Sequence, residues 1–125
     1  MGMNILVVDD SEKLRMGVIL FLKRAGFTDI QEATGEQHAW TFLTTGQYSF
    51  DLVITDTQME EDQSGWYICQ YVRYHFPSTK IILMSANAEM LEKARQQNIP
   101  LDMIFDKSVG LPTLVQIVRS LGITP

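Results

Sequence analysis

The sequence predicts an α/β fold in which a mostly parallel sheet is covered by helices on both faces. Two uninterrupted apolar runs, at residues 5–8 and 52–54, are typical of strands that are buried on both faces. Strand-like and helix-like segments alternate five times along the chain, which indicates βα units joined by right-handed crossovers. We therefore expect five strands in one sheet.

The length of the chain limits the number of domains, and its charge limits the partners that it can bind. The chain has 125 residues, a formal net charge of −5 and a pI near 4.8. This length suits one domain with its own hydrophobic core. The ten lysine and arginine residues are scattered along the chain, so we expect no basic surface and no direct binding of nucleic acid.

The expected compartment follows from cysteine usage and from hydropathy. Cys69 is the one cysteine, so the chain cannot form an internal disulfide, and its helical context predicts a small buried side chain. Met1 leads straight into the first strand without an export signal, and no apolar run is long enough to span a bilayer. We expect a cytoplasmic protein without membrane contact.

The five strands are predicted at residues 4–9, 29–33, 51–56, 80–85 and 101–106. After the first strand, Ser11 is placed to cap a helix and Gly26 is placed to end it. The apolar residues of this helix share one stripe at helical spacing: Leu14, Val18, Phe21, Leu22 and Ala25. We expect that stripe to pack against the sheet.

Four further helices are predicted from their own apolar stripes. These are Ala39, Phe42 and Leu43 after Gly35; Trp66, Cys69, Val72 and Phe76, with Arg73 on the same helix, before Pro77; Met90, Leu91 and Ala94; and Leu114, Val115, Val118 and Leu121 before Gly122. Pro112 suits the first turn of the last helix. The fourth helix, at residues 88–98, has few apolar residues, so we expect it to be the most mobile.

Three acidic residues lie where two of the predicted strands end. Asp9 and Asp10 follow the first apolar run, and Asp56 follows the run at residues 52–54. Parallel strands end at the same edge of a sheet, so these three carboxylates should meet there if the two strands are neighbours. Because like charges repel, the cluster indicates a hard divalent cation with oxygen ligands, such as Mg²⁺, with Mn²⁺ as an alternative.

Two more polar residues follow the fourth and fifth strands. Ser85 ends one of these strands and Lys107 follows the other, so both should reach the same edge as the acids. A hydroxyl, an ammonium group and a metal ion together match the three peripheral oxygens of a phosphoryl group. Asp56 then offers the nucleophilic oxygen, and the product is an acyl phosphate. A single Asp, Ser or Lys at a strand end more often forms a turn or cap, and only the combination points to this chemistry.

With these residues in place, the chain resembles a response-regulator receiver domain, the phospho-acceptor module of two-component signalling. The resemblance rests on residues 5–11, 51–56, 58–59, 82–86 and 105–107, and it extends from Asn4 to Leu121. It implies one receiver domain over residues 1–125, with a core at 4–121. It also implies a flavodoxin-like doubly wound (βα)5 fold with strand order 2-1-3-4-5.

The resemblance further implies a role for each site residue. Asp56 is the phosphorylated residue, Asp9, Asp10 and Asp56 with the backbone carbonyl of Gln58 hold Mg²⁺, and Ser85 and Lys107 contact the phosphoryl group. The implied phosphodonor is a sensor histidine kinase or a histidine phosphotransfer protein. Phosphorylation is expected to change the surface of the fourth helix, fifth strand and fifth helix, which contacts a downstream output domain or protein or a second copy in a homodimer. Such a protein catalyses its own phosphorylation and dephosphorylation only.

Several positions depart from the family pattern. Glu60 stands where the loop after the acceptor usually has proline, and one extra residue precedes Gly65. Ser108 replaces the usual proline after the lysine, and Ile104 replaces an aromatic residue that takes part in switching. Because strand side chains alternate between faces, Phe105 should not take over from Ile104. By resemblance, the amides of Gln58 and Asn87 tune the lifetime of the acyl phosphate.

Two alternatives to a phosphorylated switch remain at this stage. The departures at Ile104, at Ser108 and in the loop are compatible with a degenerate receiver that serves as a phosphorylation-independent docking module. A haloacid-dehalogenase-like phosphatase also combines Asp, Ser or Thr, Lys and Mg²⁺, but its nucleophile lies on the first strand in an Asp-x-Asp motif. The chain is expected to be either a stand-alone receiver or one module of a longer regulator or hybrid kinase.

Overall fold

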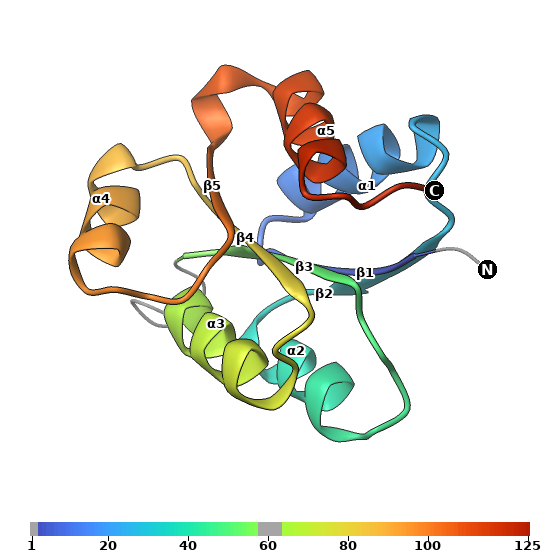
Figure 1. The fold of residues 1–125 in the computed structure, drawn as a ribbon. Coiled ribbons are helices and arrows are strands. Elements are labelled where there is room, and N and C mark those ends of the chain that lie inside the picture. Colours follow the sequence, from blue (N-terminus) through green and yellow to red (C-terminus); the bar gives the residue numbers. More distant parts are fainter. Residues whose placement is uncertain (1–2, 58–63) are drawn as a thin grey trace.

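The computed structural model describes residues 3–57 and 64–125, which form a sheet with helices on both faces (Figure 1). The strands are β1 (Asn4–Val8), β2 (Asp29–Ala33), β3 (Leu52–Asp56), β4 (Lys80–Ser85) and β5 (Met103–Asp106). The helices are α1 (Glu12–Arg24), α2 (Glu36–Thr44), α3 (Ser64–His75), α4 (Ala88–Gln96) and α5 (Leu111–Ser120), with a 3-10 turn, η1 (Lys107–Val109), before α5. Among the described residues, no helix is long and apolar enough to cross a membrane.

All strand pairs are parallel, and the sheet has the order β2-β1-β3-β4-β5. The predicted fold class and strand order are therefore confirmed. This order places β1 beside β3 and β3 beside β4, with β5 at the edge. The carboxyl ends of β1, β3, β4 and β5 consequently lie along one edge, where the loops that carry the predicted site begin.

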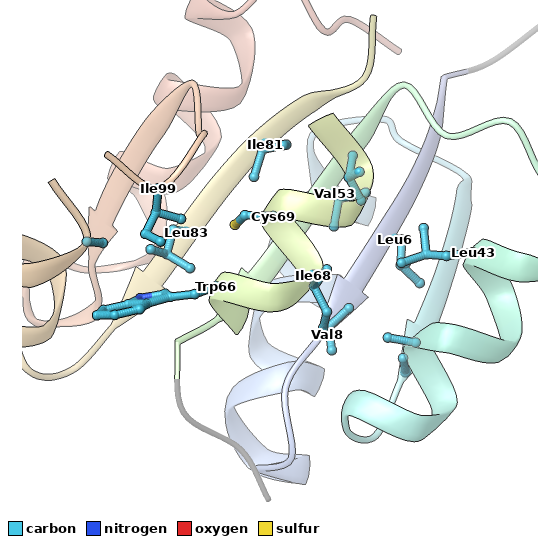
Figure 2. Close-up of a cluster of buried hydrophobic side chains, with 14 of the residues drawn as sticks. Leu6, Val8, Leu43, Val53, Trp66, Ile68, Cys69, Ile81, Leu83 and Ile99 are labelled. Atoms are coloured by element: carbon cyan, nitrogen blue, oxygen red, sulfur yellow. The ribbon is translucent and has the colours of Figure 1, made fainter. Parts of the chain in front are cut away.

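The alternation of strand side chains divides the core into two layers. Ile5 and Val7 face the layer under α1 and α5, whereas Leu6 and Val8 face the layer under α2, α3 and α4. Figure 2 shows the second layer, in which Cys69 of α3 is buried among strand side chains, as its sequence context predicted. Each layer buries its own helices, so the central strands are apolar on both faces.

Helix α1 begins as predicted, and Val18 and Leu22 of the predicted stripe are buried. The backbone N–H of Leu14 donates to the Ser11 hydroxyl at 3.4 Å, which is an N-cap bond, and Gly26 follows the helix with a φ of 103°. The prediction that Leu14 belongs to the buried stripe was wrong, because its side chain is 43% exposed. Arg15 is buried instead, at 6% exposure, and its guanidinium group donates hydrogen bonds to polar partners.

Strands β3 and β5 begin later than predicted, at Leu52 and Met103, and an aspartate directly precedes each of them. The side chain of Asp51 accepts from the backbone N–H of Asn4 at 2.8 Å. Similarly, Asp102 accepts from the backbone N–H of Ile81 at 2.7 Å and from Arg73 at 2.8 Å. The backbones of the two aspartates also pair with these strands, since the N–H of Asp51 donates to the carbonyl of Asn4 at 2.8 Å and the N–H of Asp102 donates to the carbonyl of Ile81 at 2.9 Å. Each carboxylate thus adds a second bond to the backbone at the amino end of the strand.

Helix α4 is held by three buried residues, Met90, Leu91 and Ala94, which are the three that the sequence predicted. It ends at Gln96 instead of residue 98, because Asn98 adopts a left-handed conformation with a φ of 55°. Asparagine tolerates this conformation, which closes the last turn. On the neighbouring strand, Phe105 packs in the layer under α1 and α5 and Ile104 packs on the opposite layer. The predicted alternation in β5 is therefore confirmed.

Candidate functional site

The five residues predicted to hold the metal ion and the phosphoryl group, outside the loop at 58–63, line one open pocket of about 280 Å³ at the carboxyl edge of the sheet. They are Asp9, Asp10, Asp56, Ser85 and Lys107, and they come from the ends of β1, β3, β4 and β5. Ser11, Thr57 and Asn87, which was predicted to tune the lifetime of the acyl phosphate, complete the polar part of the lining. Residues that are far apart in the chain thus meet because parallel strands end at the same edge.

The Lys107 ammonium group joins two of the acids. Its Nζ lies 2.9 Å from Oδ2 of Asp9 and 3.4 Å from Oδ2 of Asp56. The Asp9 side chain is fully buried and the Lys107 side chain is 12% exposed, so this pair is largely shielded from water. Such a pair is sensitive to the loss of either partner, because an unpaired charge would remain in a poorly solvated place.

Asp9 is held from two further sides. Its Oδ1 accepts the backbone N–H of Ser11 at 3.0 Å, and its backbone carbonyl accepts from Nη1 of Arg15 at 2.9 Å. Nε of Arg15 in turn lies 2.8 Å from Oε1 of Glu32 on β2. Arg15 is a site residue that was not predicted from the sequence. The one indication of this role in the sequence is that an arginine lies within the buried stripe of α1. A buried guanidinium group needs hydrogen-bond partners.

Gly65 lies against the backbone of Asp56. Its backbone N–H donates to the carbonyl of Thr57 at 3.0 Å, and a Cβ atom at this position would stand 1.8 Å from the carbonyl oxygen of Asp56. No side chain fits in that space. The backbone N–H of Thr57 also donates to Oδ1 of Asp56 at 2.9 Å, which fixes the orientation of the carboxylate. The first turn of α3 is therefore part of the support of Asp56.

Ser85 connects the pocket to helix α4. Its hydroxyl accepts the backbone N–H of Asn87 at 2.9 Å, and Oδ1 of Asn87 accepts the backbone N–H of Glu89 at 2.9 Å. Asn87 is the N-cap of α4, so two hydrogen bonds lead from the Ser85 hydroxyl to the first turn of that helix. A change in the position of this hydroxyl would reach α4 directly.

The acidic cluster has the donor chemistry for a hard cation. One carboxylate oxygen from each of Asp9, Asp10 and Asp56 can be chosen so that all three atoms lie within 4.8 Å of one another. Carboxylate oxygens are the ligands that Mg²⁺ and Mn²⁺ prefer, and Asp10 is exposed at the mouth of the pocket. Gln58, whose backbone carbonyl was predicted as a further ligand, lies outside the described residues.

The comparisons with known proteins show the family of this chain. The family model for the response regulator receiver domain matches residues 5–119. This chain belongs to that family. It is a receiver domain of two-component signalling with a CheY-like fold, and its strand order and acidic pocket are those of such a domain. The haloacid-dehalogenase-like alternative is wrong, because the matched family is a different one.

Solved structures support the receiver fold over nearly the whole chain. The chemotaxis response regulator CheY4 of Vibrio cholerae has 21% identity and a TM-score of 0.82, and the match covers 96% of this chain and 98% of that one. A response regulator receiver protein of Pseudomonas putida has 27% identity and a TM-score of 0.77, with the same coverage. The response regulator TrrA of Thermotoga maritima has 26% identity and a TM-score of 0.81, covering 95% of this chain and 98% of that one. No curated protein matches this chain.

The surroundings of Asp56 raise the pKa of its carboxyl group from the usual 3.8 to about 6. Burial is the largest cause, because it disfavours the charged form. The Lys107 ammonium group opposes this shift, and the neighbouring Asp9 carboxylate adds to it. In this receiver domain an ionised Asp56 is therefore costly unless a further cation joins Lys107.

The stability of the receiver domain should consequently fall as pH rises from about 4 to 6 in the absence of divalent cations. Within this window the folded state keeps a proton on Asp56 that the unfolded state has already lost, so the free energy of unfolding decreases by about 2 kcal/mol after allowance for partial solvent screening. Denaturant unfolding in EDTA, repeated at several pH values between about 4 and 6, measures this decrease in the free energy of unfolding. Asp56→Asn should lack this part of the decrease and be more stable than wild type above about pH 6. Equal slopes for the two proteins would contradict the raised pKa.

Two of the positions that depart from the family pattern, Ile104 and Ser108, lie within the described residues. Ile104 is partly buried against the layer under α2, α3 and α4 and does not line the acidic pocket. Ser108 donates its backbone N–H to Asp106 at 2.9 Å within η1, and the described residues contain no cis peptide bond. Glu60 and the extra residue before Gly65 lie outside the described residues, as does the amide of Gln58.

Proposed function

We propose that this receiver domain is a phosphorylation-dependent switch in which Asp56 accepts a phosphoryl group from a histidine kinase or a histidine phosphotransfer protein. The observation that carries the proposal is the position of the Asp56 carboxylate. It lies 3.4 Å from the Lys107 ammonium group and beside Asp9 and Asp10, in an open pocket. A nucleophilic oxygen, a cation for the phosphoryl charge and a set of metal ligands are thereby within reach of one incoming group.

In the proposed reaction, an oxygen of Asp56 attacks the phosphorus atom of a phosphohistidine. The new O–P bond forms while the P–N bond breaks, and the electron pair stays on the imidazole nitrogen, which takes up a proton. Asp9, Asp10 and Asp56 would hold Mg²⁺, which would neutralise charge on the phosphoryl oxygens. The TrrA relative was solved in complex with Mg²⁺ and BeF, which supports the assignment of this metal.

The remaining residues of the pocket have roles that follow from their contacts. Lys107 is already within ion-pair distance of Asp56, so a small movement would bring its ammonium group onto a phosphoryl oxygen. The Ser85 hydroxyl would donate to another oxygen, and the hydrogen bonds from Ser85 to Asn87 and on to α4 would pass this change to the surface of α4, β5 and α5. The Asn87 amide would also tune hydrolysis of the acyl phosphate.

The proposal is tested by incubating the protein with acetyl phosphate and Mg²⁺ and measuring its intact mass. We expect wild type to gain one phosphoryl group, Asp56→Asn to gain none, and the control variant Asp29→Asn, changed at an exposed position of β2, to behave as wild type. EDTA should stop the labelling of wild type. Undiminished labelling of Asp56→Asn, or an unlabelled wild type, would remove Asp56 as the acceptor.

A phosphorylation-independent docking module is the second candidate, and the observation that favours it is Ile104, which replaces the aromatic residue expected by resemblance. Amide chemical shifts recorded with Mg²⁺ and beryllofluoride distinguish the two functions. Shifts that spread from the pocket to α4 and α5 support a switch. Shifts confined to the pocket, or absent, support the docking module.

A further inference from the structure

A second pocket of about 280 Å³ lies next to the acidic pocket, between α1, the sheet and the start of α5. Gly17, Val18, Met84, Phe105 and Leu111 form its apolar lining, and Val18, Met84 and Phe105 belong to the buried core. The pocket is open to solvent, and its floor is formed by these core side chains. A cavity of roughly 150 Å³ can hold benzene, which makes this pocket large enough for one or two rings.

The absence of a side chain at position 17 helps to keep this pocket open. A Cβ atom at Gly17 would stand 3.2 Å from Cδ1 of Leu111, across the gap between α1 and α5. Glycine within a helix makes that helix less stable than alanine does. The chain therefore accepts a less stable helix at a position that borders the pocket.

The pocket has a cation at its rim. Of the two lysines in its lining, Lys107 is committed to Asp9 and Asp56, so its aliphatic stem can contribute to the apolar wall. Lys13 is exposed and forms no ion pair with any residue that the structure describes. An apolar cavity beside an available ammonium group is complementary to a molecule with an apolar body and one negative charge.

We propose that this pocket binds a small amphipathic anion, with one or two rings packed on Met84 and Phe105 and a carboxylate or similar group at Lys13. The pocket shares Leu14 and Lys107 with the acidic pocket, so a bound molecule would touch the residue that pairs with Asp56. Binding of this molecule should therefore change the surroundings of the residues in the acidic pocket. This inference goes beyond the proposed function and does not depend on phosphorylation.

The test is a titration of the metal-free protein with naphthalene-2-carboxylate, followed by amide chemical shifts. We expect saturable binding with a dissociation constant on the order of 0.1–1 mM, which is usual for a ligand of this size. The largest shifts should occur at Gly17, Gly110 and Leu111, and smaller ones at Asp9 and Asp56. Neither Mg²⁺ nor a phosphodonor is present, so this result is separate from the outcome of phosphate labelling.

Variants decide whether the pocket itself is the binding site. Gly17→Leu, which places a side chain in the pocket, should weaken binding at least tenfold, and Gly17→Ala, which favours the helix, should weaken it less. Lys13→Gln and the neutral probe naphthalene-2-carboxamide should each lose about two- to fivefold, the usual size of an exposed charge pair. Lys23→Gln, a change of an exposed lysine of α1 outside the pocket, should bind as wild type.

Three outcomes would overturn the proposal. The first is that wild type shows no saturable binding of the probe. The second is that Gly17→Ala, Gly17→Leu and Lys13→Gln, each folded, all bind the probe as tightly as wild type does. The third is concentration-dependent dimerisation of the free protein, with the same residues shifted and no effect of the probe. In that last case the occupant of the pocket is a second copy of the chain.

Discussion

Gly65→Ala is expected to destabilise the protein by about 3 kcal/mol or more and to abolish labelling of Asp56 under native conditions. The new Cβ atom would stand 1.8 Å from the carbonyl oxygen of Asp56 and 2.9 Å from Cα of Thr57, both of which are backbone atoms. Rotation of a side chain cannot relieve contacts with backbone. Either α3 or the end of β3 must move, and Asp56 moves with the latter.

Urea unfolding monitored by circular dichroism measures the loss, and intact mass after incubation with acetyl phosphate measures labelling. Gly46→Ala is the matched control, because nothing lies within 4 Å of its added Cβ atom and its φ of 75° should cost only about 1–2 kcal/mol. Gly65→Ala should lose clearly more than Gly46→Ala. Similar losses would show that the first turn of α3 can move away from Asp56 at little cost.

Lys107→Met is expected to cost about 3 kcal/mol of stability at about pH 8 without divalent cations. Methionine keeps most of the apolar stem but removes the ammonium group that lies 2.9 Å from Asp9 and 3.4 Å from Asp56. The carboxylate of Asp9 is fully buried and would be left without its counter-charge. Mg²⁺ should restore part of the stability, because a cation at the acidic cluster would replace the lost charge.

Thermal melts of Lys107→Met with EDTA and with Mg²⁺ measure both effects. The control is Lys23→Met, which removes one positive charge from the exposed face of α1 and should change stability by less than about 0.5 kcal/mol. Labelling of Lys107→Met by acetyl phosphate should be about 10–100-fold slower, as expected from the loss of one charge-assisted hydrogen bond. A variant as stable as wild type in EDTA would mean that Asp9 does not depend on this pair.

The larger features of this protein could be predicted from its sequence. Apolar runs followed by polar residues indicated the strands, and Asp56, Ser85 and Lys107 were placed at strand ends because sheet periodicity is a local property of the chain. The parallel arrangement then brought those ends to one edge. The opposite orientations of Ile104 and Phe105 followed from the same period of two.

Other features depended on packing between distant segments. Helical spacing alone suggested Leu14 as a buried residue, but the carbonyl of Asp9 and the side chain of Glu32 made the neighbouring face suitable for Arg15. The carboxylates of Asp51 and Asp102 likewise accept backbone N–H groups from other strands, of Asn4 and Ile81. Such partners have no fixed spacing in the sequence.

The fold class, the carboxyl ends of β3, β4 and β5 and the residue types at those ends followed from the sequence, because hydrophobic periodicity and capping act over a few neighbouring residues. The tertiary structure alone decided the contact of Gly65 with Asp56, the burial of Arg15 and the pocket beside Gly17. Each of these depends on distances between segments that are remote in the chain, and those distances are set by how the helices pack on the sheet.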